Sequence, residues 1–255
     1  MPSYFTSLIS CGAVVRAVLL IATVLCWLWI VPMARDMYGP MTGPSAWMMA
    51  ATWDARFLLM MWAMWAVMMA GMMLPSASPM LLLYARLARR GSDASRAVPL
   101  VYAVAAGYLL VWVAFSAAAT LLQRLLAALL LITPMMEISS SRAGGVLLLV
   151  AGGYQFTPWK AACLGVCRSP LAFLMQRWRA GAAGAFQLGW QHGLFCLGCC
   201  WALMLLLFVG GVMNLRVIIA LSLLVLIEKV APFGVQGSRI AGVALIALGL
   251  WMFVG

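Results

Sequence analysis

The only histidine of the chain stands close to three cysteines, in a cluster made of His192, Cys196, Cys199 and Cys200. An apolar run over residues 201–209 follows directly, so this His/Cys cluster belongs to a helix that crosses a membrane. At about 100° per residue, Cys196 and Cys199 fall within roughly 40° of His192, and the last cysteine lies about 80° away. Such side chains are costly at membrane depth unless they have a function. We therefore expect soft-metal binding or thiol chemistry on one face of this helix.

A second pair of thiols, Cys163 and Cys167, precedes this helix and shares one face if its own segment is helical. Thiolate and imidazole together bind Zn²⁺, Cu(I) or iron tightly. At about 1.5 Å per residue, Cys196 lies roughly 15 Å and Cys199 roughly 20 Å inside the start of the membrane helix, whereas the pair belongs near the inner interface. A single site requires the segment 157–183 to fold back into the bundle. The alternative is two sites along a conducting path, and both arrangements stay open.

Methionine is unusually frequent, with 20 residues in a chain of 255. Met61, Met68 and Met72 fall within about 40° of one another on a helical projection. Thioether sulfur is a soft ligand suited to Cu(I), so Met68 and Met72 are candidates for weaker metal ligands. The alternative is flexible core packing beside the kink expected at Pro75. We favour packing for the stripe as a whole, because the methionines of residues 60–80 cover more than one face.

The composition excludes a soluble globular protein. Hydrophobic residues make up 67% of the chain and charged residues 8%, with a mean hydropathy of +1.09. Soluble domains have about 45–50% and 25%, respectively. We predict an all-α, polytopic transmembrane helical bundle in which residues 1–255 form a single integral membrane domain. Basic residues in membrane loops account for the net charge of +11, so the expected partner is the lipid bilayer and not nucleic acid.

A chain of this length with short loops accommodates six or seven spans of about 20 residues. The expected spans are residues 13–31, 57–84, 98–122, 144–156, 185–212, 215–230 and 240–254. With seven spans and the N-terminus inside, eleven lysine and arginine residues fall on the inner side and five on the outer side. This charge asymmetry predicts a multi-pass protein with a cytoplasmic N-terminus. A re-entrant 144–156 segment would invert the topology of everything downstream.

Two further features concern helix contacts. Gly189 and Gly193 form a Gly-x₃-Gly pattern that lets another helix approach closely at the histidine. Glu228 and Lys229 stand near the end of the 215–230 span, where they form either an internal ion pair or an end cap whose lysine reaches the membrane interface. We favour the end cap.

Six stretches, taken in order, resemble a bacterial family of predicted metal-binding integral membrane proteins. They are residues 72–80 (MMLPSASPM), 154–160 (YQFTPWK), 167–170 (CRSP), 192–201 (HGLFCLGCCW), 211–214 (GVMN) and 228–229 (EK). The resemblance covers roughly residues 55–250 and implies a helical membrane bundle with a metal site in the bacterial inner (plasma) membrane. The ligands that the resemblance implies are Cys163, Cys167, His192, Cys196, Cys199 and Cys200.

The leading hypothesis is a soft-metal binding membrane protein that transports copper, as Cu(I), or supplies it to a partner metalloprotein. Zinc is the alternative ion. Cys163 and Cys167 would capture the metal at the inner face, and the His/Cys cluster would hold it at mid-depth. The chain has no Gly-rich phosphate loop, no zinc-protease motif and no pair of intramembrane carboxylates, so we assign no catalytic residue.

Two other functions stay open. Cys196 and Cys199 form a C-x₂-C pair, and Cys163 with Cys167 could be its exchange pair in a membrane thiol–disulfide oxidoreductase. That enzyme needs access to the periplasm, which the predicted topology denies to the second pair. The third function is an assembly or scaffold subunit, as part of an oligomer, whose cysteines merely pack.

Overall fold

The computed structural model describes residues 2–39, 43, 47, 53–90, 96–133 and 135–254, with side chains from residue 12 onward. Within these ranges the elements are helices, and β structure is limited to an isolated bridge between Ile132 and Ile138. The prediction of an all-α fold is therefore confirmed.

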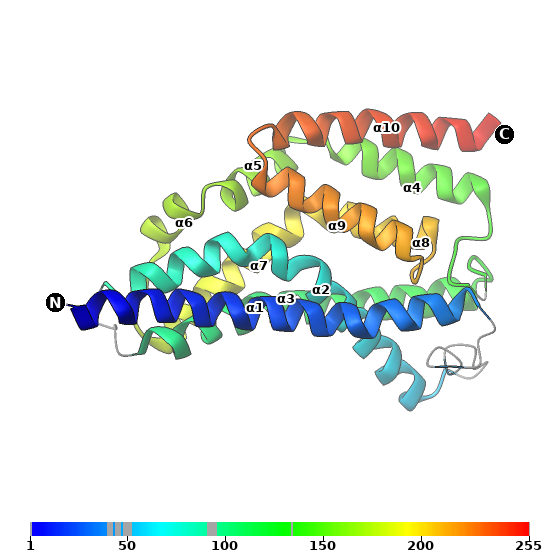
Figure 1. Cartoon of the computed structure of the whole chain (residues 1–255). Coiled ribbons are helices and arrows are strands. Elements are labelled where there is room, and N and C mark those ends of the chain that lie inside the picture. The colour runs from blue at the N-terminus through cyan, green and yellow to red at the C-terminus, as the bar shows by residue number, and fades with distance from the viewer. Residues whose placement is uncertain are drawn as a thin grey trace.

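In chain order the helices are α1 (Pro2–Met37), α2 (Ala55–Ala88), α3 (Ala97–Ala128), α4 (Ser141–Tyr154), α5 (Pro158–Arg168), α6 (Pro170–Arg177), α7 (Gly181–Leu205), α8 (Leu207–Gly210), α9 (Leu215–Val230) and α10 (Gly234–Val254) (Figure 1). In the described part of the chain, five stretches are long and apolar enough to cross a membrane: most of α1, then α2, α3, α7 with α8, and α10. Their mean hydropathy lies between 1.8 and 2.5, which is the make-up of a multi-pass membrane protein.

The expected count of six or seven spans is not established by this fold. α4 and α9 contain 14 and 16 residues, fewer than the about 20 that cross the hydrocarbon core of a bilayer. α4 cannot continue because Thr157 caps a new helix and Pro158 occupies its first turn. The segment 157–183, expected as a connection, contains the short helices α5 and α6.

Two groups of helices make up the bundle (Figure 1). In the first group α3 packs against both α2 and α7, and α1 packs along α2. In the second group α4 pairs with α10, and α9 contacts both α10 and α2. α5 contacts α7 and α9, so it connects the two groups at the end of the bundle where α7 and α10 begin (Figure 1).

The contact between α3 and α7 depends on glycine. Gly189 of α7 faces the main-chain oxygen of Val104 so closely that a Cβ there would overlap it. Gly107 of α3 faces the main-chain oxygen of Phe186 in the same way. Gly193 continues the contact one turn further along α7. The expected Gly-x₃-Gly contact is therefore present, and it brings α3 against the helix that carries the His/Cys cluster.

A buried ion pair ties α5 to α9. The Nζ of Lys160 lies 2.8 Å from a carboxylate oxygen of Glu228, and both side chains are 1% exposed. Lys160 also donates to the Gln155 side chain, and Arg168 donates to the main-chain oxygen of Glu228 over 2.6 Å. An unpaired charge in this interior would be strongly unfavourable, so the pair holds α5 in the bundle. Glu228 and Lys229 are both buried, so the expected end cap is wrong.

The substitution Gly189→Ala should destabilise the bundle, because the added methyl group would meet the main chain of Val104. Overpacking of this kind costs about 1–3 kcal/mol. Thermal unfolding in detergent, followed by tryptophan fluorescence, should show a lower midpoint. The matched control is Gly153→Ala on α4, where a Cβ meets nothing within 4 Å. Equal midpoints for the two variants would contradict the close approach of α3 and α7.

The substitution Lys160→Met should destabilise the protein by about 3–5 kcal/mol, because the buried carboxylate of Glu228 loses its counter-charge. Adding Glu228→Gln should recover most of that loss, since the second change removes the charge left unpaired. The same thermal measurement compares the single and double variants. A double variant that is no more stable than the single one would show that the ion pair does not constrain α5.

Candidate metal centre

Three thiols of α7 are enclosed in the bundle. Cys196, Cys199 and Cys200 are each 0–1% exposed. The thiols of Cys199 and Cys200 donate to the main-chain oxygen of Cys196 over 3.1 and 2.9 Å. The three residues lie within about one turn of helix, so their sulfur atoms occupy one level of the bundle. The face that periodicity assigns to these thiols is therefore an interior face.

α5 brings a second pair of thiols to this level. The sulfur of Cys163 lies against Gly198, where a Cβ would be 2.7 Å from it. The thiol of Cys167 interacts with that of Cys199. Cys163 and Cys167 are residues of intermediate exposure, whereas the three cysteines of α7 are buried. The segment 157–183 folds back so that α5 contacts α7, which the arrangement with a single site requires.

A buried lysine lies among the thiols. The Nζ of Lys229 donates to the Sγ of Cys196 over 2.8 Å and to the Ser76 hydroxyl over 3.2 Å. The Tyr108 hydroxyl lies 3.0 Å from the same sulfur and donates to the main-chain oxygen of Met73 over 3.3 Å. A buried ammonium group at this position can balance the negative charge of a metal-bound thiolate. Sequence reasoning missed this group of residues, and its one signal was a lysine inside an apolar stretch.

The imidazole of His192 is 4% exposed, and its Nδ1 has no hydrogen-bond partner in the described part of the chain. Its ring centre lies 5.4 Å from that of Phe173 in α6 and 5.8 Å from that of Tyr108 in α3. Arg177 fixes α6 in this position because it donates to the Gln191 side chain over 3.1 Å. Buried ring nitrogens are rarely left unpaired, so this nitrogen is available as a metal ligand.

Met68 and Met72 lie on the buried side of α2, where they are 0% and 2% exposed. The same is true of Met61, Met64, Met69 and Met73. Because the buried methionines cover more than one face of α2, their arrangement has the character of core packing. α2 reaches the cysteine level through the Ser76 hydroxyl and the main-chain oxygen of Met73. A role for Met68 and Met72 as weaker ligands stays a prediction.

The candidate ligands are not arranged as a closed metal site. Among the residues that the structure describes, no three His, Cys, Asp or Glu side chains are arranged to hold an ion. The reason is local, since Cys199 and Cys200 turn their thiols to a main-chain oxygen and Cys163 packs against Gly198. Convergence on an ion requires rotation about the Cα–Cβ bonds of these cysteines. Thiols and an unpaired imidazole are nevertheless a ligand set that suits a soft ion.

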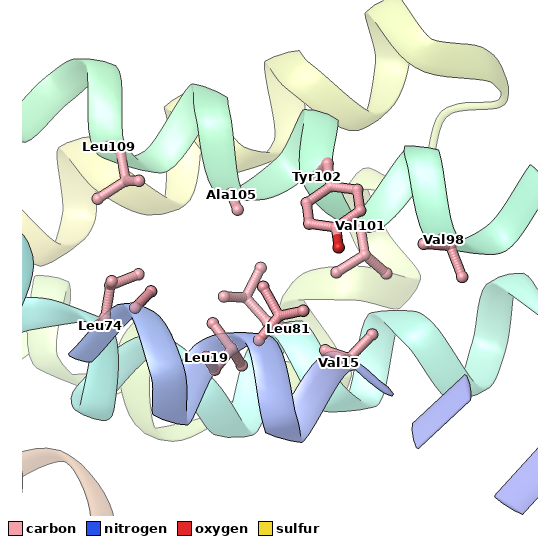
Figure 2. Close-up of a pocket in the computed structure, with 11 residues that line it drawn as sticks. Val15, Leu19, Leu74, Leu81, Val98, Val101, Tyr102, Ala105 and Leu109 are labelled. Carbon is pink, nitrogen blue, oxygen red and sulfur yellow. The ribbon is translucent and has the colours of Figure 1, made fainter. Parts of the chain in front are cut away.

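A cavity between α1, α2 and α3 has a different chemistry (Figure 2). Its volume is about 150 Å³, and the side chains that line it include Val15, Leu19, Leu74, Leu81, Val101 and Leu109. Apart from Tyr102, the residues that Figure 2 labels are aliphatic and offer no ligand to a metal ion. The cysteine level, and not this cavity, is therefore the candidate centre.

Comparison with protein families agrees with this chemistry. The model of the PpoB2 family, described as copper chaperone, matches residues 62–252. That range contains α3 to α9 complete, with every cysteine and the histidine of the candidate centre. No curated protein and no solved structure matches the chain. The expected kinship with a metal-binding family is confirmed, and the chain belongs to the PpoB2 copper chaperone family.

Proposed function

We propose that the chain binds Cu(I) at the thiols of α7 and α5 and carries it to a partner metalloprotein. The observation that carries the proposal is the 2.8 Å contact between the Nζ of Lys229 and the Sγ of Cys196. A lysine is costly in the interior of a membrane bundle and calls for a functional partner. In a chain of a copper chaperone family, a thiolate–copper group supplies that partner.

Charge balance explains why a lysine stands beside these thiols. Cu(I) bound by two thiolates has a single negative charge, and one ammonium group neutralises it. Burial of an unbalanced charge in a low-dielectric interior is strongly unfavourable. Cys196 supplies one thiolate because its sulfur already accepts from Lys229, and Cys199, whose thiol interacts with it, supplies the other. The unpaired Nδ1 of His192 can add a neutral ligand without changing the balance.

Zinc is the weaker candidate. Zn²⁺ carries twice the charge of Cu(I), so the same balance needs three thiolates beside Lys229. Structural zinc sites also take four ligands in a fixed tetrahedron.

Cys163 and Cys167 would receive the metal, because they are the partly buried thiols of the centre. Cys167 would pass it to Cys199 by ligand exchange, since their thiols already interact. Cys200 would be a further soft ligand beside Cys196 and Cys199. Met68 and Met72 of α2 would serve as weaker ligands beyond the cysteines.

The proposed orientation of the protein in the membrane follows from the distribution of its basic residues. Basic residues gather at the end of the bundle that carries α5 and α6, and they include Arg86, Arg89, Arg90, Arg96, Arg177 and Arg179 (Figure 1). Under the positive-inside rule this end faces the cytoplasm. The N-terminus is then cytoplasmic, in the bacterial inner membrane, and α4 and α9 bring the number of spans to six or seven.

A thiol–disulfide oxidoreductase is the second candidate. The interaction between the thiols of Cys167 and Cys199 favours it, because exchange requires a thiolate beside its target sulfur. A scaffold whose cysteines merely pack is the third. The three functions differ in whether copper binds and whether a disulfide forms.

The variant Cys196→Ser/Cys199→Ser should lose the copper held at the cysteine level while the bundle stays folded. Copper per chain is measured by elemental analysis after anaerobic purification and loading with Cu(I). The matched control is Cys26→Ser, a partly buried cysteine of α1, which should bind copper as the wild type does. Unchanged copper in the double variant would refute the site. Absence of copper from every protein, with a Cys167–Cys199 disulfide after mild oxidation, would support the oxidoreductase instead.

The variant Lys229→Leu should weaken Cu(I) binding by about 10–100-fold, as loss of a group that supports metal ligands typically does. The physical reason is that the copper–thiolate group would keep its negative charge inside the bundle. Lys229→Arg, which keeps the positive charge, should retain more of the affinity. Competition with a chromophoric Cu(I) chelator measures the three affinities. Equal affinities for the leucine variant and the wild type would rule out charge balance.

A further inference from the structure

Three loops meet at the end of the bundle opposite α5 and α6: the end of α1, the segment after α3, and the turn between α8 and α9 (Figure 1). The Tyr38 hydroxyl donates to the Glu137 carboxylate over 2.7 Å, and the Asn214 side chain lies beside the same hydroxyl. A Cβ on Gly211 would lie 2.7 Å from the Glu137 carboxylate. These side chains form a polar cap over the interior.

A methionine directly precedes each of the three polar residues of the cap. Met37, Met136 and Met213 are 0%, 4% and 0% exposed, whereas Tyr38 is 46% exposed. The three methionines are therefore buried, whereas the polar residues that follow them are partly or fully exposed. Met136 also has a backbone φ of 60°, in the left-handed region that residues other than glycine rarely adopt. Such strain persists only where the surrounding structure demands it, and here it accompanies a buried thioether.

We propose that Met37, Met136 and Met213 form a second Cu(I) site beneath this cap. The inference rests on the proposed function, because it takes Cu(I) as the cargo. Thioethers are soft, neutral ligands that suit Cu(I) and bind it more weakly than thiolates do. Copper on three thioethers keeps its single positive charge, and the Glu137 carboxylate in the cap supplies the opposite charge. The site is therefore suited to releasing copper and not to storing it.

Further buried thioethers lie between the cysteine level and the cap. Met204 follows Cys200 by one helical turn on α7 and is fully buried. Met61 and Met64 of α2 are fully buried as well, and they belong to the same continuous core as the three methionines beneath the cap. α2 begins at the end of the bundle where α1 ends, so these two residues lie on the side of the cap (Figure 1). Copper would therefore leave the cysteines toward the end of the bundle away from α5.

The test counts copper in five purified proteins loaded anaerobically with Cu(I). The wild type should bind about two equivalents. Met37→Leu/Met136→Leu/Met213→Leu and Cys196→Ser/Cys199→Ser should each lose one equivalent, and the combined variant should lose both. Leucine matches methionine in volume, so the core stays filled. Met175→Leu, at a methionine that is 74% exposed, is the matched control and should bind as the wild type does.

A spectroscopic measurement identifies the ligand. Selenomethionine-labelled Cys196→Ser/Cys199→Ser protein should show copper–selenium scattering by X-ray absorption, and a single added Met213→Leu change should reduce it. Full copper binding by the triple methionine variant, with loss only in the cysteine variant, would overturn the second site and leave the proposed function intact. Full binding by the cysteine variant would overturn the proposed function instead. If the triple variant does not fold, unchanged scattering in the Met213→Leu variant would still reject the site.

Discussion

Two neighbouring charges of opposite sign, Glu228 and Lys229, stand inside the bundle at the end of α9. Consecutive residues of a helix point about 100° apart, so each side chain is directed to a different neighbour. Glu228 pairs with Lys160 of α5, and Lys229 donates to the sulfur of Cys196 in α7. The low dielectric of the interior makes both contacts obligatory. They hold α5, α7 and α9 at one level of the bundle.

The position of the thiols follows from this constraint. α5 is a short helix that would otherwise lie at the membrane interface, and the ion pair draws it into the bundle with Cys163 and Cys167. The close glycine contact between α3 and α7 then brings the Tyr108 hydroxyl to the sulfur of Cys196. A protein with the proposed function has to bind copper and also release it. Enclosed thiols beside an ammonium group, with partly buried thiols at their edge, offer both properties.

Much of this protein could be predicted from the order of its residues. Composition alone indicates an all-helical membrane protein, because no soluble domain buries so large an apolar fraction. Periodicity assigns His192, Cys196 and Cys199 to one helix face, since spacing along a single helix is a local property. Gly189 and Gly193 predict a close helix contact for the same reason. The motifs around these residues also point to a metal-binding family, as the match to the copper chaperone family shows.

What the tertiary structure alone decided concerns distances between helices. Spacing within one helix cannot say whether Cys167 reaches Cys199, because that depends on where α5 lies. The end of α9 is a second example of what spacing cannot predict. If α9 faced lipid, Lys229 would extend to water, but α9 packs against α2 and α7 and the side chain is buried. Tyr108 and Ser76 carry no local signal, because they join the centre only through contacts between helices. The sequence therefore determined which thiol and imidazole side chains share one face of α7. Only the packing of the helices decided which side chains of other helices lie beside them.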